Sequence, residues 1–280
     1  MSDYERFRVR PESRVDLSKF DPAQTPGCKN KDEAAKRLQR DCEALTHLQY
    51  LLYAENKRSL LVVLQALDGG GKDGTVEHVF QSFNPQSAYV HPFKVPSALE
   101  ASHDFLWRAH AAAPAHGQTA IFNRSHYEDV LTVRVHDLVP KDVWSKRYDR
   151  INDFEKNLTE AGTTIVKFFL HISPEAQLAR FKKRLDDPTH QWKISESDYT
   201  ERKHWGDYIK AYEALLDRCS TAHAPWYVVP ADKKWYRNLV VGGVIRETLE
   251  KMDPKTPAPA VDIEQIRRQY HEAANGTEPT

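Results

Sequence analysis

A glycine-rich loop at residues 66–73, with the sequence Ala-Leu-Asp-Gly-Gly-Gly-Lys-Asp, constrains this chain more than any other stretch. It follows the apolar run 59–64 and leads directly into a helical pattern. Glycines let the backbone curl so that successive N–H groups point into one hollow, and the positive end of the following helix adds to the attraction for an anion. Lys72 places a further charge where terminal phosphates would lie. The loop therefore predicts a phosphate-binding site where a strand meets a helix.

The loop departs from the pattern G-x-x-x-x-G-K-[ST] at two positions. Ala66 stands where the first glycine belongs, and Asp73 stands where the pattern has a magnesium-binding hydroxyl. Asp68 and Asp73 are therefore candidates for holding the metal instead. The alternative is a turn between strand and helix that binds no ligand. Three consecutive glycines followed by lysine in this context favour the phosphate site.

Length and charge set broad limits on the class of protein. The 280 residues suit one large α/β domain with extensions, or two domains. Lys and Arg total 40 and so do Asp and Glu, so the global charge points to no nucleic-acid partner, and affinity for a polyanion must come from local clustering. The three cysteines lack C-x-x-C spacing and indicate reduced thiols, without a zinc site. A charged N-terminus and the absence of a long apolar run predict a soluble, cytoplasmic protein with no membrane contact.

Strand-like and helix-like patterns alternate along the chain. Apolar runs predict strands at 59–66, 87–93, 119–123, 164–172 and 226–229. Helical patterns lie at 72–82, 97–112, 126–138, 141–161 and 174–186, and a long amphipathic helix that starts at Lys31 precedes the first strand. This alternation predicts βαβ units and a mostly parallel sheet, whose ligands gather at the carboxyl ends of the strands.

A second candidate site follows the predicted strand 119–123. This strand ends in Asn123, an amide that can orient a metal-bound water but supplies no charge, so the anionic role shifts to Asp68, with Asp73 as a second candidate. Arg124 comes next and has a planar fork suited to phosphate oxygens, and Arg134 is a further candidate on the predicted helix 126–138. The alternatives are a helix cap in which Ser125 bonds the first turn, and a solvated helix face for Arg134.

A basic group lies on the predicted helix 174–186. Helical spacing places Arg180, Lys183 and Arg184 on one face. In a phosphate-loop kinase this is where a lid delivers arginines onto transferring phosphates and excludes water. The alternative is an ordinary solvated face. Ser195, with Asp198 three positions later, predicts a helix N-cap and needs no catalytic role.

Several motifs in this order resemble the polyphosphate kinase 2 family. They are Ala-Leu-Asp-Gly-Gly-Gly-Lys-Asp-Gly at 66–74, Phe-Asn-Arg-Ser-His-Tyr-Glu-Asp-Val at 122–130, the basic run 180–184 with Lys193, and the segments 224–227 and 230–235. The resemblance covers roughly residues 30 to 252. It implies a P-loop kinase fold like that of thymidylate kinase: an α/β three-layer sandwich with a central, mostly parallel five-stranded sheet, a helical lid and an N-terminal helical extension. It also implies a requirement for Mg²⁺ and transfer of phosphate between inorganic polyphosphate and a nucleotide.

The residues and the resemblance together assign roles and boundaries. Asp68, Lys72 and Arg124 are expected to be catalytic, with Asp68 also holding the metal. The residues expected to bind substrate or phosphate are Gly69, Gly70, Gly71, Asp73, Gly74, Asn123, Glu128, Arg134, Arg180, Lys183 and Arg184. We expect an extended arm at 1–30, a kinase domain at 31–252 with a lid at about 180–207, and a C-terminal linker with a short helix at 253–280. The expected partners are inorganic polyphosphate, adenine nucleotides and further copies of the chain in a homo-oligomer.

The second motif differs from a common family version, Asp-Arg-Ser-Trp-Tyr-Asn. This chain has Asn123, His126 and Glu128 where that version has Asp, Trp and Asn, which looks like the branch that accepts both nucleoside monophosphates and diphosphates. Glu128 is expected to accept a hydrogen bond from an amino group on the base. Two alternatives stay open: an ATP-dependent nucleoside monophosphate kinase, and a non-catalytic nucleotide-binding regulator.

Overall fold

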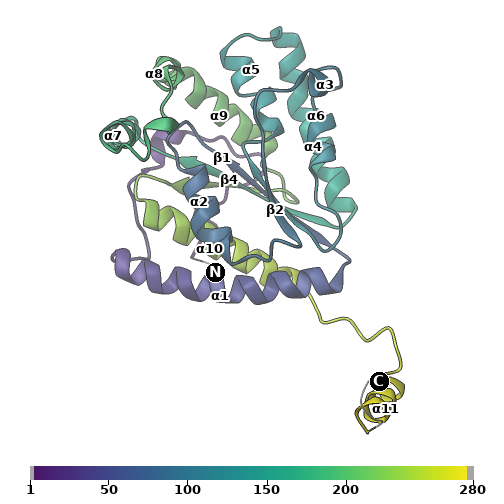
Figure 1. The fold of residues 1–280 in the computed structure, drawn as a ribbon. Coiled ribbons are helices and arrows are strands. Elements are labelled where there is room, and N and C mark those ends of the chain that lie inside the picture. Colours follow the sequence, from purple (N-terminus) through teal and green to yellow (C-terminus); the bar gives the residue numbers. More distant parts are fainter. Residues whose placement is uncertain (1–2, 276–280) are drawn as a thin grey trace.

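Five parallel strands form the centre of the protein in a computed structural model that describes residues 3–275 (Figure 1). The strands are β1 (Ser59–Gln65), β2 (Ala88–Pro92), β3 (Thr119–Asn123), β4 (Thr163–His171) and β5 (Trp226–Pro230), in the order β2-β3-β1-β4-β5. All strand pairings are parallel. The predicted fold class, an α/β sandwich around a five-stranded sheet, is confirmed.

The register of the sheet brings the two predicted sites together. All seven residues of β1 are buried, as its continuous apolar run requires in a strand covered on both faces. Leu64 pairs with Asn123 of β3, and Gln65 pairs with Phe169 of β4. The glycine-rich loop therefore leaves β1 beside the end of β3.

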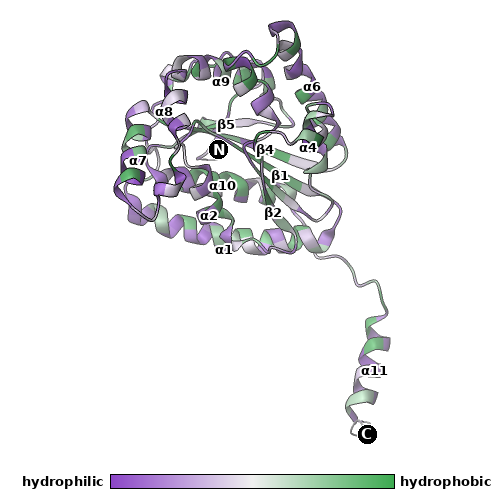
Figure 2. Cartoon of the chain, turned by 45° about the horizontal axis from the view of Figure 1, so that its top comes forward, coloured by the Kyte–Doolittle hydropathy of each residue, from purple (hydrophilic) through white to green (hydrophobic). Residues whose placement is uncertain are grey.

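Helices cover both faces of the sheet. They are α1 (Lys31–Glu55), α2 (Lys72–Val79), α3 (Ala98–Ala101), α4 (Trp107–Ala111), α5 (Thr132–Val135), α6 (Lys141–Glu160), α7 (Pro174–Asp186), α8 (Glu196–Arg202), α9 (Trp205–Cys219), α10 (Lys234–Met252) and α11 (Ile263–Asn275). Short 3-10 turns are η1 (Glu5–Phe7), η2 (Leu17–Lys19), η3 (Phe80–Ser82), η4 (His126–Asp129) and η5 (Gln191–Lys193). In Figure 1, α1, α2 and α10 lie on one side of the sheet and α4, α5, α6 and α9 on the other. Figure 2 shows that the hydrophobic residues concentrate in the strands and in α10, between these layers.

Two predicted helices are not continuous. The prediction for 97–112 is wrong because the segment contains α3 and α4 with a break between them, where the Asp104 carboxylate accepts from the backbone N–H of Leu106 and starts a new turn. The prediction for 126–138 is wrong because a 3-10 turn, η4, is followed by the single helical turn α5. Tyr127, Val130 and Leu131 are buried at helical spacing in this segment, although the backbone is not one helix.

Residues 3–30 pack along the edge of the sheet. Phe7 and Leu17 are buried in the core. The backbone N–H of Val9 donates to Trp226 O at 2.8 Å, and Arg8 forms an antiparallel bridge with Tyr227, so the arm lies against β5. The Leu17 N–H donates to Glu213 Oε1 at 2.9 Å. These contacts hold an irregular segment on the body without a long helix or strand.

The C-terminal helix stands apart from the sandwich. Residues 253–262 lead away from α10, and all described residues of α11 are exposed (Figure 1). None of the helices within residues 3–275 combines the length and apolar character needed to cross a membrane.

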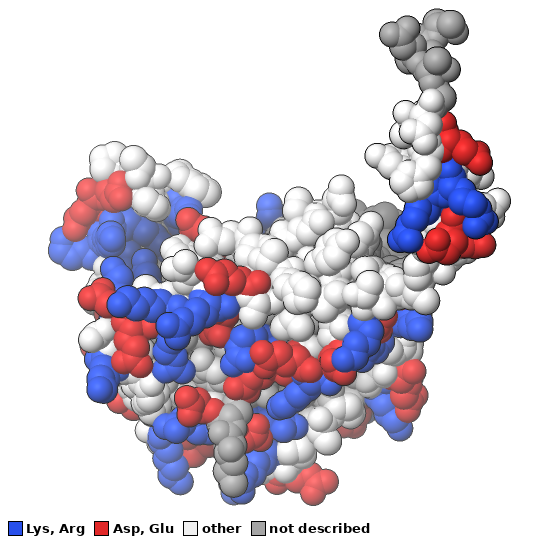
Figure 3. All heavy atoms as spheres, turned by 90° about the horizontal axis from the view of Figure 1, so that it is seen from below, with Lys and Arg blue, Asp and Glu red and all other residues white. Residues whose placement is uncertain are grey.

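Charges of both signs cover the surface around α1. Figure 3 shows acidic and basic side chains intermixed over this face, as the balanced composition leads us to expect. Basic side chains gather toward the left of this view, the side on which Figure 1 places α7. Lys182 and Lys183 are exposed on that helix.

Candidate functional site

The glycine-rich loop forms a tight turn between β1 and α2. Gly69 and Gly71 have φ angles of 74° and 101°, in the left-handed region that favours glycine. The Gly70 N–H donates to Leu67 O at 2.9 Å, and a Cβ at Gly70 would lie 2.5 Å from the Ala66 methyl. Gly71 is the N-cap of α2, so the positive end of this helix opens onto the loop. This geometry suits an anion.

Lys72 is the first residue of α2 and is buried. Its Nζ donates to Ala66 O at 2.9 Å. Burial, followed by the nearby charge of Arg124, lowers the pKa of Lys72 to about 8, against an ordinary 10.5. The ammonium group therefore stays charged at neutral pH but is destabilised, and a phosphate oxygen would offset this cost.

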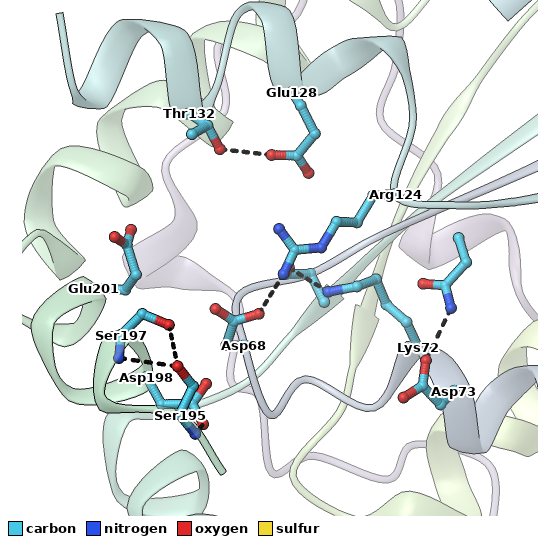
Figure 4. A network of polar contacts seen from close by, with 12 residues as sticks. Asp68, Lys72, Asp73, Arg124, Glu128, Thr132, Ser195, Ser197, Asp198 and Glu201 are labelled. Carbon is cyan, nitrogen blue, oxygen red and sulfur yellow. Dashed lines mark hydrogen bonds and ion pairs between the residues drawn. The ribbon is translucent and has the colours of Figure 1, made fainter. Parts of the chain in front are cut away.

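Arg124 meets Asp68 across the end of the sheet. Its Nη2 donates to Asp68 Oδ1 at 2.7 Å, and its backbone N–H donates to Leu64 O at 3.0 Å. Arg124 adopts a φ of 60°, which costs a residue with a side chain about 1 kcal/mol or more and is typical of functional sites. Figure 4 shows its guanidinium pointing toward Asp68 beside Lys72.

Asn123 and Asp73 are hydrogen-bonded to each other. The Asn123 side-chain amide donates to Asp73 Oδ1 at 2.8 Å. These are two positions at which the chain departs from familiar motifs, and the contact joins them. A carboxylate at 123 would face the Asp73 carboxylate at hydrogen-bonding distance and would repel it.

Glu128 lies near the same charges. Its Oε2 accepts from the Thr132 hydroxyl at 2.6 Å, and its charge acts on Lys72 and Arg124 (Figure 4). Between Arg124 and Glu128, the Ser125 side chain accepts from the Tyr127 N–H at 3.2 Å. The cap interpretation of Ser125 is therefore confirmed, and it coexists with a site role for Arg124.

The predicted basic residues of α7 have three different environments. Arg180 Nη1 donates to Gly69 O at 2.6 Å, and its Nη2 donates to Ala231 O and, at 3.1 Å, to Asp232 O. Arg184 Nη1 lies 3.8 Å from the Asp198 carboxylate, whereas Lys183 is exposed. Arg180 thus binds the loop itself, and Arg184 ties α7 to α8.

Arg134 contacts α6, which the sequence did not predict, whereas Asp198 makes the contact with Ser195 that the sequence predicted. Arg134 donates to Tyr148 Oη at 3.3 Å, and its guanidinium lies 5.0 Å from the centre of the Trp144 ring, so its present contacts are with α6. Asp198 forms the predicted N-cap arrangement with Ser195. Figure 4 shows Asp198 and Glu201, on α8 in the segment predicted to be a lid, across from Asp68.

A buried polar cluster holds the segment that follows Arg124. Lys167 Nζ donates to Glu155, to Tyr127 Oη at 2.8 Å and to Cys219 O at 2.8 Å. The Tyr127 hydroxyl donates to Glu155 Oε1 at 2.8 Å, and buried His126 Nε2 lies 3.5 Å from the same oxygen. The cluster fixes η4, and with it the position of the preceding arginine.

Sequence reasoning missed Arg237 on α10. This side chain is 1% exposed and lies beneath the loop, where its Nη1 approaches Gly70 O at 3.5 Å. Burial, followed by the nearby Arg180, lowers the pKa of Arg237 to about 9, so it remains a cation at neutral pH. No spacing in the sequence distinguishes it from the other arginines of the chain.

The acidic residues of the site suit a metal that arrives with its substrate. No cluster of three or more His, Cys, Asp or Glu side chains within residues 3–275 could form a protein cage for an ion. Among the described residues, hydrogen bonds and ion pairs to the Asp68 carboxylate reach Oδ1 only, so Oδ2 is available to coordinate a metal ion. Mg²⁺ usually takes one or two carboxylates together with substrate phosphates and water, and Asp68 fits that pattern.

Comparisons with known proteins agree with this geometry. A family model described as polyphosphate kinase 2 matches residues 28–257. The chain is 48% identical over 262 residues to the AMP/ADP-polyphosphate phosphotransferase of Meiothermus ruber, covering 93% of this chain and 98% of the relative. It is 43% identical over 280 residues to the ADP-polyphosphate phosphotransferase of Rhodopseudomonas palustris, covering 94% and 97%. The crystal structure of polyphosphate kinase 2 from Arthrobacter aurescens TC1 superposes with a TM-score of 0.93 at 41% identity and covers 97% of each chain.

Proposed function

The chain belongs to the polyphosphate kinase 2 family, and we propose that it transfers the terminal phosphate of inorganic polyphosphate to AMP and ADP, giving ADP and ATP. The observation that carries this proposal is the loop, where buried Lys72 stands beside Arg124 and donates to Ala66 O. The charges of Asp68, Glu128 and Asp73 act on Lys72, but none of the carboxylates in residues 3–275 forms an ion pair with it. The relative from Meiothermus ruber, which the chain matches along almost its whole length, is named for both acceptors. The reaction is expected to be reversible.

Phosphate transfer between these two substrates requires positive charge in the site more than it requires a general base. A nucleotide phosphate is already anionic near neutral pH, so it attacks without a strong general base. The difficulty is to bring two polyanions in line and to hold the charge that spreads over the transferred group. Lys72 and Arg124 would act on that group, and Arg180, Arg184 and Lys183 would hold the polyphosphate near the lid.

Asp68 is the residue that we expect to hold Mg²⁺. A bound magnesium ion would neutralise phosphate charge and help to orient the transferred group. Asp68 also pairs with Arg124, so it fixes the direction of the guanidinium fork. Positioning of the metal is the first role that we assign to Asp68, and activation of the acceptor is the second.

Asn123 and Glu128 are proposed to favour acceptance of AMP. AMP is shorter than ADP by one phosphate and must reach further toward the polyphosphate end. The neutral Asn123 holds Asp73 by a hydrogen bond, so no second carboxylate repels the approaching phosphate. Glu128 would then hold the nucleoside in register through a hydrogen bond to the base.

One experiment separates this function from its alternatives. The purified protein is incubated with AMP and Mg²⁺, together with either long-chain polyphosphate or ATP as the donor, and nucleotides are separated by chromatography. We expect ADP and then ATP with polyphosphate. Phosphorylation of AMP only when ATP is the donor would instead identify an ATP-dependent monophosphate kinase, and nucleotide binding without turnover would identify a regulator. Light scattering on the same sample tests the expected homo-oligomer.

A further inference from the structure

Arg237 is an arginine in the core of the protein. It lies on α10 and is among the largest side chains that are fully buried. A guanidinium removed from water costs several kcal/mol unless a carboxylate or another anion compensates for the lost hydration. The contacts of Arg237 therefore need an explanation.

The contacts of Arg237 do not include an acid. Its Nε and Nη2 donate to the side-chain oxygen of Asn238 at 3.1 and 2.8 Å, and the approach of Nη1 to Gly70 O is long, at 3.5 Å. No carboxylate among residues 3–275 lies within ion-pairing distance of it. The charged group that acts on Arg237 is Arg180, which has the same sign. The protein thus buries this cation beside another cation.

The two guanidiniums converge on one glycine of the loop. A Cβ at Gly71 would lie 1.8 Å from Arg237 Nη1 and 3.4 Å from Arg180 Nη1. A Cβ at Gly74, in the first turn of α2, would lie 3.2 Å from Arg237 Nη2. Arg237 therefore packs directly against the loop and the start of α2, on the buried side of both.

This position orients the backbone of the loop. In a trans peptide the C=O and the N–H point in opposite directions. Gly70 O faces Arg237, so the N–H of the same peptide, which belongs to Gly71, points away from α10. The Gly71 N–H donates to none of the described residues. Arg180 holds the preceding carbonyl, that of Gly69, in a similar way.

We propose that Arg237 is a positioning residue that supplies a buried positive charge beneath the phosphate loop and is compensated by a polyphosphate group bound on the other side. The inference rests on the proposed function. Arg237 does not touch the substrate. It acts through the loop, because it turns the Gly71 N–H toward the ligand and adds its charge to that of Lys72 and the helix N-terminus. In the ligand-free protein the buried charge of Arg237 lowers the free energy of unfolding, and in the complex the same charge strengthens binding of polyphosphate.

Two substitutions at this position separate charge from structure. Arg237→Gln removes the charge but keeps a group that can hydrogen-bond, and Arg237→Lys keeps the charge. Arg246→Gln is the matched control, because Arg246 lies on the same helix and has acids as partners: Asp41 at 2.8 Å and Glu250. The melting temperature of each full-length protein is measured with and without inorganic tripolyphosphate and Mg²⁺, and the apparent Kd for tripolyphosphate is taken from the shift.

We expect Arg237→Gln to melt at or above the wild-type temperature without tripolyphosphate and to bind it about tenfold more weakly or worse. Arg237→Lys should bind it within about threefold of the wild type, since the charge remains. In the kinase assay, Arg237→Gln should raise KM for polyphosphate more than it lowers kcat, because the charge acts on the bound chain throughout the reaction. Arg246→Gln should melt lower and bind tripolyphosphate normally.

Other outcomes overturn the inference. An Arg237→Gln protein that melts well below the wild type and binds tripolyphosphate normally would show that Arg237 only supports the fold. Equal loss of binding in Arg237→Gln and Arg237→Lys would exclude charge as the cause. A wild-type protein that neither binds tripolyphosphate nor forms ATP would overturn the proposed function itself. The wild-type measurement alone therefore distinguishes failure of the proposed function from failure of the inference about Arg237.

Discussion

Replacing Lys72 with Met tests whether the loop takes part in phosphate transfer. Burial lowers the pKa of Lys72 from 10.5 to about 8, and each unit corresponds to about 1.36 kcal/mol, so keeping the charge costs the ligand-free protein roughly 3 kcal/mol. At pH 7 both the folded and the unfolded pKa lie above the pH, so this cost is fully present. It is relieved only as the pH rises from about 8 toward 10.5, where the unfolded chain binds the additional proton.

The same figure sets the expected loss of activity. A phosphate that compensates for this charge gains a contact worth roughly 3 kcal/mol, which corresponds to about a hundredfold or more in turnover. The substitution also removes a hydrogen bond to Ala66 O, worth about 1 kcal/mol, so the ligand-free Lys72→Met protein should be at least as stable as the wild type. The combination of intact stability and lost turnover is the result that we expect.

The assay measures ATP formed from ADP and polyphosphate at pH 7, together with the free energy of unfolding in urea. Lys57→Met is the matched control, because Lys57 is exposed and precedes β1 at the end of the strand opposite the loop. It should leave both quantities unchanged. A folded Lys72→Met protein with near-normal turnover would remove the loop from the mechanism and refute the reasoning.

Three further predictions concern neighbouring residues. Asp68→Asn should lower turnover by about a hundredfold and raise the Mg²⁺ concentration needed for half-maximal rate, and an unchanged magnesium titration would argue against its role at the metal. Asn123→Asp combined with Glu128→Asn should slow the AMP step by about tenfold or more while sparing the ADP step, in separate assays of each acceptor; equal loss on both would mean that the two positions serve general phosphate chemistry. Burial lowers the pKa of His126 below 6.5, so as the pH falls the unfolded chain takes up the proton before the folded protein does, and acid reduces the free energy of unfolding. The variant His126→Phe should therefore lose less of this free energy below pH 6.5 than the wild type does. Identical slopes of unfolding free energy against pH in the two proteins would contradict this.

The strands were predictable because each is an apolar run between polar segments. Every predicted strand boundary lies within one residue of the observed one. The loop and Asn123 could be placed at the same edge of the sheet for the same reason, since parallel strands end together. The pairings of side chains at that edge were not predictable. No spacing in the sequence indicates that Asn123 binds Asp73, or that Arg124 adopts a φ of 60° and binds Asp68.

Helix predictions failed where the pattern of buried residues does not match the backbone conformation. Helix α10 carries no amphipathic pattern, because residues 236–245 are all buried, and Gly242 and Gly243 interrupt it. Its Arg237 was therefore missed together with the helix. The opposite error occurred at 97–112 and 126–138, where the sequence has helical patterns although the chain turns between short segments. Apolar periodicity reports which side chains face the core, and a broken segment can satisfy it as well as a straight helix.

The bridge between the arm and β5 has a consequence for how the chain is made. β5 is the last strand in sequence and an edge of the sheet, and the arm that covers this edge comes from the first thirty residues. The Ser220 hydroxyl, for example, donates to Val9 O across 211 positions. During synthesis the arm leaves the ribosome first, yet its docking surface is among the last parts of the domain to form. The apolar strand 226–230 therefore stays open to pairing with another chain until the arm returns to it, and a shortened arm would leave this edge permanently available for aggregation.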